Sequence, residues 1–259
     1  MQERELNSWE EFLEASKPCI EAETRPQPLL FRGQANSEWG LQTTLERRGH
    51  GLYSASVYYQ QIGIVSRTLE TVTGRHWELP ELTTREDCSS TPTGYAYMAF
   101  LRQNGFPSPL LDWSRSPYVA SFFAYHDAKA VQAGGKVAIY AFQEYGEQGK
   151  QIDMRGPAIL GLGRWIATDR KHFLQQSEYT ICRRMRGNDL LYCPHEDAMK
   201  TPVEDYFFRQ DLLTKFILPA KEAPRVRARL YQMNITEYSL FEDTRALLSI
   251  FADDVLGPK

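Results

Sequence analysis

Three short segments hold the residues whose types and spacing best suit chemistry: 30–34 (LFRGQ), 105–124 (GFPSPLLDWSRSPYVASFFA) and 176–186 (QSEYTICRRMR). Arg32, in the first segment, is a permanent, forked cation that matches phosphate and carboxylate groups. Taken alone, this arginine is most simply expected to pair with a buried carboxylate such as Asp112 in the second segment. The first segment is therefore either a binding site for an anion or half of a structural ion pair.

The third segment combines a carboxylate with a run of cations. Gln176 and Glu178 stand two residues apart, so on a strand they would face the same side of a sheet. The cations that follow are Arg183, Arg184 and Arg186. The stretch 164–186 holds six basic and two acidic residues in a chain whose net charge is −3. Such a stretch suits a polyanionic ligand, although solvated surface is the commoner use of basic residues.

Other familiar signatures are incomplete. The segment 161–163 (GLG) lacks the third glycine of a dinucleotide-binding loop, because Ile166 stands in its place. Cys193 and His195 have one conceivable further ligand in Cys182, but no spacing supplies a fourth. No histidine is singled out as the partner of a cysteine nucleophile. We therefore expect no Rossmann-type loop, no metal site and no cysteine enzyme.

Patterning predicts the elements that must position these residues. A capping box at Ser8 and Glu11 begins an N-terminal helix, which Pro18 limits. The other predicted helices are 58–72, ended by Gly74; one through 97–101, ended by Asn104 and Gly105; one opened by Ser116 and Pro117; 222–233; and 243–252. The predicted strands are 28–32, 110–113, 136–142, 178–182 and 215–218. Because strands and helices do not alternate regularly, an α+β fold is favoured over a doubly wound parallel sheet.

Composition narrows the class of protein. The 259 residues are 42% hydrophobic and include four scattered cysteines, which predicts a globular core without a disulfide framework. The first residues lack the apolar core of a signal peptide, and no apolar run approaches the ~18 residues of a membrane span. We therefore expect a cytoplasmic protein without membrane contact. It divides into an N-terminal helix and lead-in, 1–27, and a single domain, 28–259.

The first two segments resemble the FRG domain family, named for its Phe-Arg-Gly motif. In that family, a strand ending in the motif is followed by a Gly-x-Pro, Leu-Leu-Asp-Trp, Ser-Pro and Phe-Ala series, which 105–124 resembles closely. Trp39 extends the first motif, and 235–243 is similar to the closing segment of the family. The resemblance spans about residues 28–250.

The FRG pattern itself resembles a divergent ADP-ribosyltransferase, which implies a split β-sandwich with flanking helices. Those enzymes place an Arg or His at the end of one strand, a Ser, Thr or Tyr on a second, and a Glu on a later one. Arg32 with Gly33 matches the first element and Ser114 the second. Gln176 and Glu178 resemble the Gln/Glu-x-Glu opening of the third. The resemblance implies NAD as co-substrate and no metal.

The reaction that the resemblance implies needs a carboxylate. Breaking the bond between nicotinamide and ribose builds positive charge on the sugar ring, as in glycoside cleavage. A fixed carboxylate beside that ring stabilises the developing charge. Glu178 is the expected catalytic acid, and Glu237 competes with it because 236–238 also looks extended.

The same resemblance assigns the cofactor-binding residues. Arg32 would hold the diphosphate or ribose of NAD, and Gly33 would let backbone amides approach the nicotinamide carboxamide. Ser114 would position the nicotinamide ribose together with Glu178. Ser116 is the second choice for that position, since a helix cap explains it equally well.

The acceptor is expected beside Gln176, with Arg183, Arg184 and Arg186 on the same segment. These charges favour a polyanion, so RNA or single-stranded DNA is the first expectation and a protein acceptor the second. FRG-like transferases resemble bacterial toxins and phage-defence effectors, which implies a neutralising antitoxin protein.

Two other functions stay open. An NAD glycohydrolase would use water in place of the acceptor. A binding module would keep the fold without the chemistry, and two departures from the family give it weight. Gln103 stands where a histidine is usual, and Pro109 stands where an arginine is usual.

Overall fold

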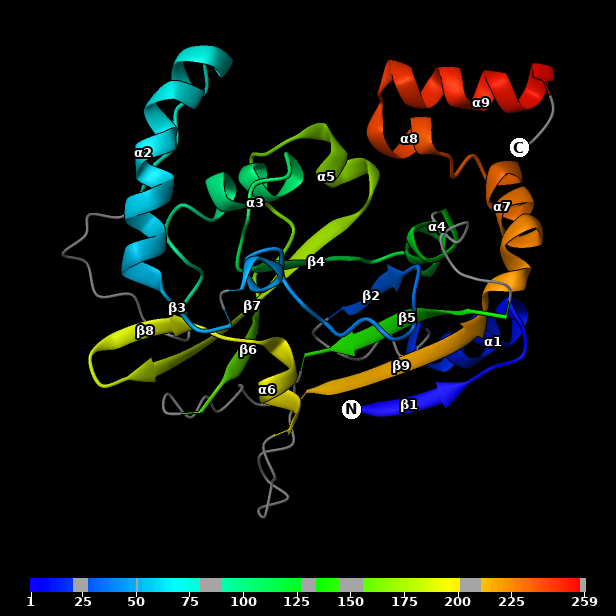
Figure 1. Ribbon diagram of the computed structural model, residues 1–259, viewed down its shortest axis with the longest axis horizontal. Coiled ribbons are helices and arrows are strands. Elements are labelled where there is room, and N and C mark those ends of the chain that lie inside the picture. The colour runs from blue at the N-terminus through cyan, green and yellow to red at the C-terminus, as the bar shows by residue number, and fades with distance from the viewer. Residues whose placement is uncertain are drawn as a thin grey trace.

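Figure 1 shows the computed structural model of the chain, which describes residues 1–20, 28–49, 51–79, 90–126, 134–144, 156–200 and 211–256. The strands are β1 (Gln2–Glu5), β2 (Leu29–Gln34), β3 (Tyr53–Ser54), β4 (Leu110–Ser114), β5 (Lys136–Gln143), β6 (Ala158–Gly161), β7 (Ser177–Arg186), β8 (Asp189–Tyr192) and β9 (Leu212–Pro219). The α-helices are α1 (Trp9–Ile20), α2 (Ala55–Thr73), α3 (Tyr95–Gln103), α4 (Pro117–His126), α5 (Arg170–Leu174), α6 (His195–Lys200), α7 (Ala223–Gln232), α8 (Glu237–Phe241) and α9 (Thr244–Leu256). Short 3-10 helices are η1 (Glu46–Arg48) and η4 (Ala220–Glu222).

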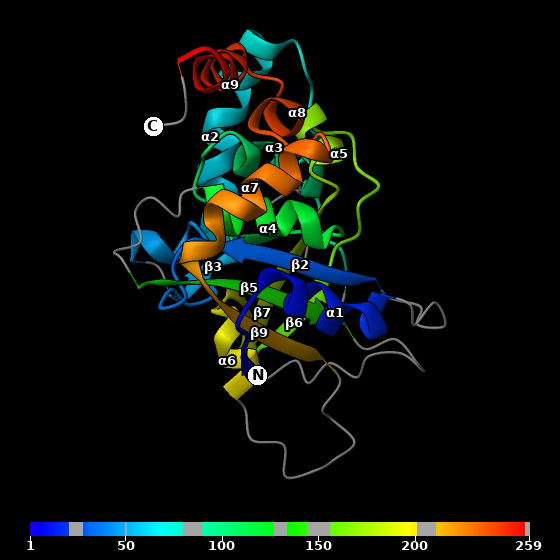
Figure 2. The same cartoon turned by 90° about the vertical axis from the view of Figure 1, so that its right-hand side faces the viewer.

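The strands form one mixed sheet. Their order is β1-β9-β5-β2-β4-β7-β8-β3, and β6 pairs with β7 outside this path. β1 runs parallel to β9, and the other pairs are antiparallel. Figure 2 shows α2, α3, α8 and α9 above the strands and α6 below them. The described chain is thus α+β, with an open mixed sheet and flanking helices, as the irregular order of predicted elements indicates.

One face of β2, β5 and β9 is covered by α1, α4 and α7. The buried side chains between them form the α4 cluster, which includes Phe12, Phe31, Val119, Phe216 and Val226. The ring of Phe12 lies 5.3 Å from that of Phe216 and 6.3 Å from that of Phe31. Burying these aromatic side chains stabilises the fold mainly by removing apolar surface from water. The N-terminal helix is therefore part of the core.

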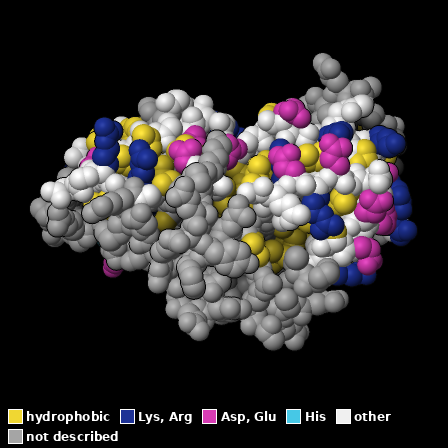
Figure 3. Space-filling view, turned by 90° about the horizontal axis from the view of Figure 1, so that it is seen from below, with side chains coloured by type: hydrophobic (Ala, Val, Ile, Leu, Met, Phe, Trp, Pro, Cys, Tyr) yellow, Lys and Arg dark blue, Asp and Glu magenta, His cyan; other side chains and the backbone are white. Residues whose placement is uncertain are grey.

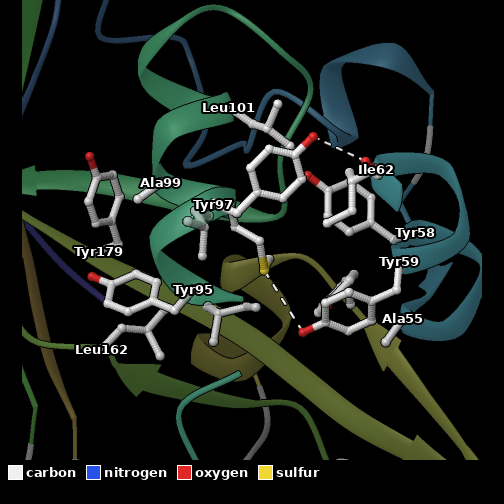
Figure 4. Packing of buried hydrophobic residues seen from close by; sticks show 14 of the residues in the cluster. Ala55, Tyr58, Tyr59, Ile62, Tyr95, Tyr97, Ala99, Leu101, Leu162 and Tyr179 are labelled. Carbon is white, nitrogen blue, oxygen red and sulfur yellow. Dashed lines mark hydrogen bonds between the residues drawn. The ribbon is translucent and has the colours of Figure 1, made fainter. Parts of the chain in front are cut away.

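The other half of the sheet packs against α2 and α3 in the α3 cluster (Figure 4), which includes Tyr58, Ile62, Tyr97, Met98 and Tyr179. The hydroxyl of Tyr97 donates to the main-chain oxygen of Ile62 at 3.1 Å. Buried tyrosines of this kind contribute apolar area while their hydroxyls keep a partner.

A third group of buried residues joins the two halves. This inner cluster includes Leu30, Phe142 and Tyr140 from β2 and β5, with Trp113 and Cys182 from β4 and β7. The rings of Trp113 and Phe142 are 5.4 Å apart. The two halves of the sheet therefore share one apolar layer.

The junction between the halves is a single pair of residues. β2 pairs with β5 over six residues, but its only register partner on β4 is Ser114, opposite Phe31. Beyond this pair, β2 and β4 diverge. On the face of β2 that α4 covers, a side chain at Gly33 would collide with the main-chain oxygen of Ala120. This glycine therefore lets α4 lie close against β2. The close helix and the diverging strands leave a hollow beside the end of β2.

Most predicted elements are confirmed. The strands predicted at 110–113, 136–142, 178–182 and 215–218 lie within β4, β5, β7 and β9, and the one predicted at 28–32 overlaps β2, which begins at Leu29. Gly74 caps α2 in the left-handed conformation, with φ of 67°. Ser116 caps α4, because its Oγ accepts from the main-chain nitrogen of Val119 at 3.3 Å. None of the helices in the described ranges is long and apolar enough to cross a membrane.

Two local predictions are wrong. Pro18 does not limit α1, which continues to Ile20, because the fixed φ of proline, about −65°, is itself compatible with a helix. Glu237 is not in an extended segment, since it is the first residue of α8. Thr236 and Ser239 form a reciprocal cap, each side chain accepting from the main-chain nitrogen of the other. The prediction of a strand overlooked this capping pair.

Candidate functional site

The hollow beside β2 and β4 is a cleft of about 800 Å³. Its volume falls within the range of about 300–1,000 Å³ that holds small molecules and cofactors. The lining residues are Phe31, Arg32, Gly33, Gln34, Ala35, Glu38, Trp39, Gly40, Gln42, Arg47, Arg102, Gln103, Asp112, Trp113, Ser114, Ala120, Phe123, Gln175, Ser177 and Phe241. Three of the predicted site residues, Arg32, Gly33 and Ser114, are therefore brought together here.

A shared carboxylate holds two arginines in this cleft. Nη1 of Arg32 donates to both Oδ1 and the main-chain oxygen of Asp112, each at 2.7 Å. Nη2 of Arg102 donates to the same Oδ1 at 2.6 Å. Burial alone would raise the pKa of Asp112, but the two guanidinium groups outweigh it and hold this pKa well below its usual range. Asp112 is therefore ionised and carries one negative charge against two positive ones.

A third arginine increases this positive surplus. Arg47, from η1, lines the cleft and makes no ion pair with any residue that the structure describes. Desolvation and then the nearby charges of Arg32 and Arg102 lower the pKa of Arg47. The lining thus contains three arginines and two acidic residues, the second being Glu38. An anion entering the cleft would relieve the repulsion among the cations.

Buried polar atoms in the lining also lack partners. Nε2 of Gln34 donates to the main-chain oxygen of Gly40 at 3.1 Å, but its Oε1 accepts no hydrogen bond from the described residues. The Nε atoms of Arg32 and Arg102 are likewise unpaired there. Buried polar atoms usually have partners. The lining can therefore offer both donors and an acceptor to a polar ligand.

The serines are engaged in main-chain contacts. Oγ of Ser114 donates to the main-chain oxygen of Gln175 at 2.7 Å and accepts from the main-chain nitrogen of Ser116 at 3.1 Å. Ser114 lines the cleft, whereas Ser116 does not. These bonds fix the junction between β4 and α4. Ser116 therefore acts as the N-cap of α4, the alternative role considered for it. Ser114 lines the cleft, but its hydroxyl is already hydrogen-bonded to the main chain.

Glu178 lies outside the cleft lining. Its side chain is 5% exposed, and Nε of Arg115 donates to its Oε2 at 2.7 Å. Ser177 lines the cleft, whereas the Glu178 carboxylate is held by Arg115 and does not. The structure therefore does not bring the Glu178 carboxylate together with Arg32, although the two residues are on strands separated only by β4.

The predicted relation between Gln176 and Glu178 is wrong. β7 begins at Ser177, and Gln176 precedes it with a φ of 49° in the left-handed region. The alternation of a strand therefore does not extend to Gln176. Its exposed side chain stays accessible, but its direction is set by the turn.

The three arginines predicted to meet an acceptor do not share one surface. Arg183 is 1% exposed, and its Nη2 donates to the main-chain oxygen of Ser90, so an acceptor cannot reach it. Arg184 is half-buried and Arg186 is exposed. The alternation and length of β7 separate these residues. On the face seen from below, basic and acidic side chains are interspersed (Figure 3).

The departures from the family pattern have different positions. Gln103 lines the cleft, and its Nε2 donates to the hydroxyl of Tyr179 at 2.7 Å. Burial raises the pKa of Tyr179, which keeps this hydroxyl protonated. Pro109 immediately precedes β4 and does not line this cleft. Gln103 therefore occupies a place where a ligand contact could differ from that of the family.

Sequence reasoning did not assign roles to Arg47 and Arg102. Arg102 is at the last turn of α3, and Arg47 is within the ERR triplet of η1. Neither has a motif of its own. The carboxylate of Asp112 places Arg102 beside Arg32, and the cleft lining alone places Arg47 near them. Among the described residues, no three His, Cys, Asp or Glu side chains gather as metal ligands.

The family model described as the FRG domain matches residues 27–133. This range includes both arginines that contact Asp112, together with Trp39 and Arg47. No curated protein and no solved structure matches the chain.

Proposed function

We propose, from the premise that residues 27–133 belong to the FRG domain family, that the cleft binds NAD and that the chain transfers ADP-ribose to an acceptor. The observation that carries this proposal is the surplus of positive charge around Asp112. Three arginines converge on a cleft that is large enough for a dinucleotide, and one of them has no ion pair in the described part of the chain. Forked guanidinium groups suit a diphosphate.

The residues present fit NAD at both of its polar parts. Arg47 and the free donors of Arg32 and Arg102 would face the diphosphate. The unpaired Oε1 of Gln34 would accept from a ribose hydroxyl or from the carboxamide. In the transfer, the bond between the ribose C1′ and the nicotinamide nitrogen breaks, and nicotinamide leaves with the electron pair. The acceptor atom then bonds to C1′ and loses its proton.

The arrangement of strands supports an ADP-ribosyltransferase fold. Arg32 is on β2, Ser114 ends β4, and Glu178 is near the start of β7, so the predicted triad comes from three adjacent strands. The inner cluster, which joins the two halves of the sheet, supports the same comparison. We propose this fold and assign stabilisation of the developing positive charge to Glu178. That role requires Arg115 to release Glu178 and the carboxylate to turn toward the cleft.

For the acceptor we propose nucleic acid. The stretch 164–186 has a positive balance, and its Arg170 and Arg186 are exposed. Phosphate contacts of this kind would make acceptor binding depend on salt. A cytoplasmic toxin or phage-defence effector with a neutralising protein is the biological role that fits such chemistry, and a protein acceptor is the alternative.

The test measures nicotinamide release from NAD together with transfer of labelled ADP-ribose to RNA, single-stranded DNA and protein. Transfer to one polymer by the wild type, lost in Glu178→Gln with folding intact, would support the proposed transferase. Release without transfer would indicate an NAD glycohydrolase. Equal release by the wild type and Glu178→Gln would contradict the role of Glu178.

A nucleotide-binding module is the second candidate. The observation that favours it is the closed ion pair between Arg115 and Glu178, which leaves that carboxylate outside the cleft. This candidate predicts that the wild type binds NAD or ADP-ribose and releases no nicotinamide under any condition. Binding measured by calorimetry beside the release assay separates it from the transferase.

A further inference from the structure

Trp39 is an exposed aromatic side chain in the lining of the cleft. Its exposed fraction is 52%, whereas Trp9, Trp77 and Trp113 are at most 9% exposed and belong to the core. Among the described residues, no aromatic ring or cation packs on its indole. Trp165, 81% exposed and outside the cleft lining, has the guanidinium of Arg164 over its ring at 4.3 Å. Trp39 is therefore the tryptophan whose ring faces are open beside the cationic cleft.

The main chain around Trp39 is held by two side chains from other elements. The hydroxyl of Tyr140 donates to the main-chain oxygen of Trp39 at 3.0 Å. The main-chain nitrogen of Leu41 donates to Oε1 of Glu196 at 2.9 Å. A side chain at Gly40 would collide with the same carboxylate, so the glycine allows this clamp. The indole is thus presented from a fixed turn.

The cations lie next to this turn along the chain. Trp39, Gln42 and Arg47 all line the cleft from the segment between β2 and β3. An aromatic face followed by an unpaired guanidinium matches a nucleotide, whose flat base is joined to its phosphates through one sugar. Stacking of a base on an aromatic side chain contributes about 1–3 kcal/mol.

We infer that Trp39 is the stacking platform for the purine base of a nucleoside diphosphate whose phosphates contact Arg47. The inference rests on the nucleotide-binding role proposed for the cleft and adds the orientation of the ligand. The base lies at the 35–47 segment, and the other end of the ligand reaches Ser114 and Ser177. That end is next to Glu178, which follows Ser177 on β7. The reacting ribose would thus meet the Glu178 carboxylate once Arg115 releases it, as the proposed function requires.

The test compares a ligand that has a base with one that lacks it. Calorimetry measures the dissociation constants of ADP-ribose and of inorganic pyrophosphate for the wild type, Trp39→Ala and Trp39→Phe. We expect Trp39→Ala to weaken ADP-ribose binding about tenfold or more and to leave pyrophosphate binding unchanged. Trp39→Phe keeps an aromatic face and is expected to retain most of the affinity.

Trp165→Ala is the matched control, because it removes an exposed tryptophan that does not line the cleft. It is expected to bind ADP-ribose as the wild type does. Equal ADP-ribose affinity in the wild type and Trp39→Ala would overturn the inference. Equal weakening of pyrophosphate and ADP-ribose in Trp39→Ala would also overturn it, because the tryptophan would then act through the fold of the cleft.

The outcomes also separate this inference from the proposed catalysis. A wild type that binds ADP-ribose through Trp39 but releases no nicotinamide from NAD would overturn the catalysis and support the stacking platform. A wild type that releases nicotinamide with the same KM as Trp39→Ala would overturn the platform and support the catalysis. A wild type that binds no ADP-ribose would overturn the inference.

Discussion

Two contacts between arginine and carboxylate lie on adjoining strands and differ in the balance of their charges. In the cleft, Arg32 and Arg102 share the single carboxylate of Asp112. Beside β7, Arg115 and Glu178 form a one-to-one pair, and the Glu178 side chain is buried. The first contact leaves a positive charge facing an open cleft, whereas the second leaves none.

This difference in charge balance distinguishes a contact that can bind a ligand from one that is structural. A buried pair in balance adds little net stability compared with apolar packing, but removing one partner is costly because the other charge loses its compensation. A cluster with surplus charge is costly by itself, and a ligand of opposite charge offsets that cost. The shared carboxylate of Asp112 therefore indicates an anion site. The ion pair between Arg115 and Glu178 must break before the proposed chemistry can use Glu178.

The largest effect is expected for Arg32→Ala. We expect the affinity for ADP-ribose to fall about 100-fold, since charged hydrogen bonds contribute roughly 1.5–3 kcal/mol each. The free energy of unfolding should change less, because Asp112 keeps Arg102. Arg32→Lys keeps the charge but not the forked guanidinium, so its affinity for ADP-ribose should lie between those of the wild type and Arg32→Ala. Calorimetry with urea unfolding checks both quantities, and unchanged affinity would contradict the anion site.

Arg115→Ala should have the reverse profile. The free energy of unfolding is expected to fall by about 2 kcal/mol, because the buried Glu178 loses its partner. The affinity for ADP-ribose should stay at the wild-type value. Arg115→Ala combined with Glu178→Gln removes both charges and should recover part of the lost stability. A loss of ligand affinity without a loss of stability would show that the two contacts are not distinct in the way described above.

Arg47→Ala and Arg48→Ala form a matched pair on η1. Arg47 lines the cleft and Arg48 does not, although both are exposed. We expect Arg47→Ala to weaken ADP-ribose binding about tenfold and to reduce its dependence on salt, because one charge contact that salt screens is lost. Arg48→Ala should match the wild type. Equal effects from the two variants would mean that general surface charge, and not the cleft, attracts the ligand.

The smallest effect is the pH dependence of the Asp112 contact. Its pKa is lower in the folded than in the unfolded chain, so the stabilisation is present above the unfolded value of about 3.9 and is lost as pH falls toward the folded value. The side chain is 37% exposed, which limits the expected difference between the wild type and Asp112→Asn at pH 7 to about 1 kcal/mol. Urea unfolding between pH 2 and pH 7, in roughly one-unit steps around that pKa, checks it. A difference that grows at low pH would contradict the sign.

Local chemistry made much of the fold predictable. The short elements β1, β3, β6 and β8 were not predicted, because too few residues repeat for a period to show. β1 is also exposed along its whole length, and only pairing with β9 makes it a strand.

The sequence indicated Arg32 as part of the candidate site but did not indicate the other two arginines in it. The pairing of Arg32 with Asp112 is confirmed, since a buried guanidinium needs a carboxylate. Arg102 and Arg47 come from different elements and carry no motif that joins them to Arg32. The strand containing Glu178 was predicted, but the face on which its carboxylate lies depends on the register with β4.

The sequence by itself determined most of the longer helices and strands and which residues carry the FRG motif, because capping, periodicity and residue type act over a few neighbours. Only the tertiary structure decided which charges meet. The single register pair between β2 and β4 opens the cleft, and the shared carboxylate of Asp112 gathers its arginines. The ion pair with Arg115 holds the Glu178 carboxylate outside the cleft lining. Charge balance in a cleft depends on distances between segments far apart in the chain, which local patterns do not encode.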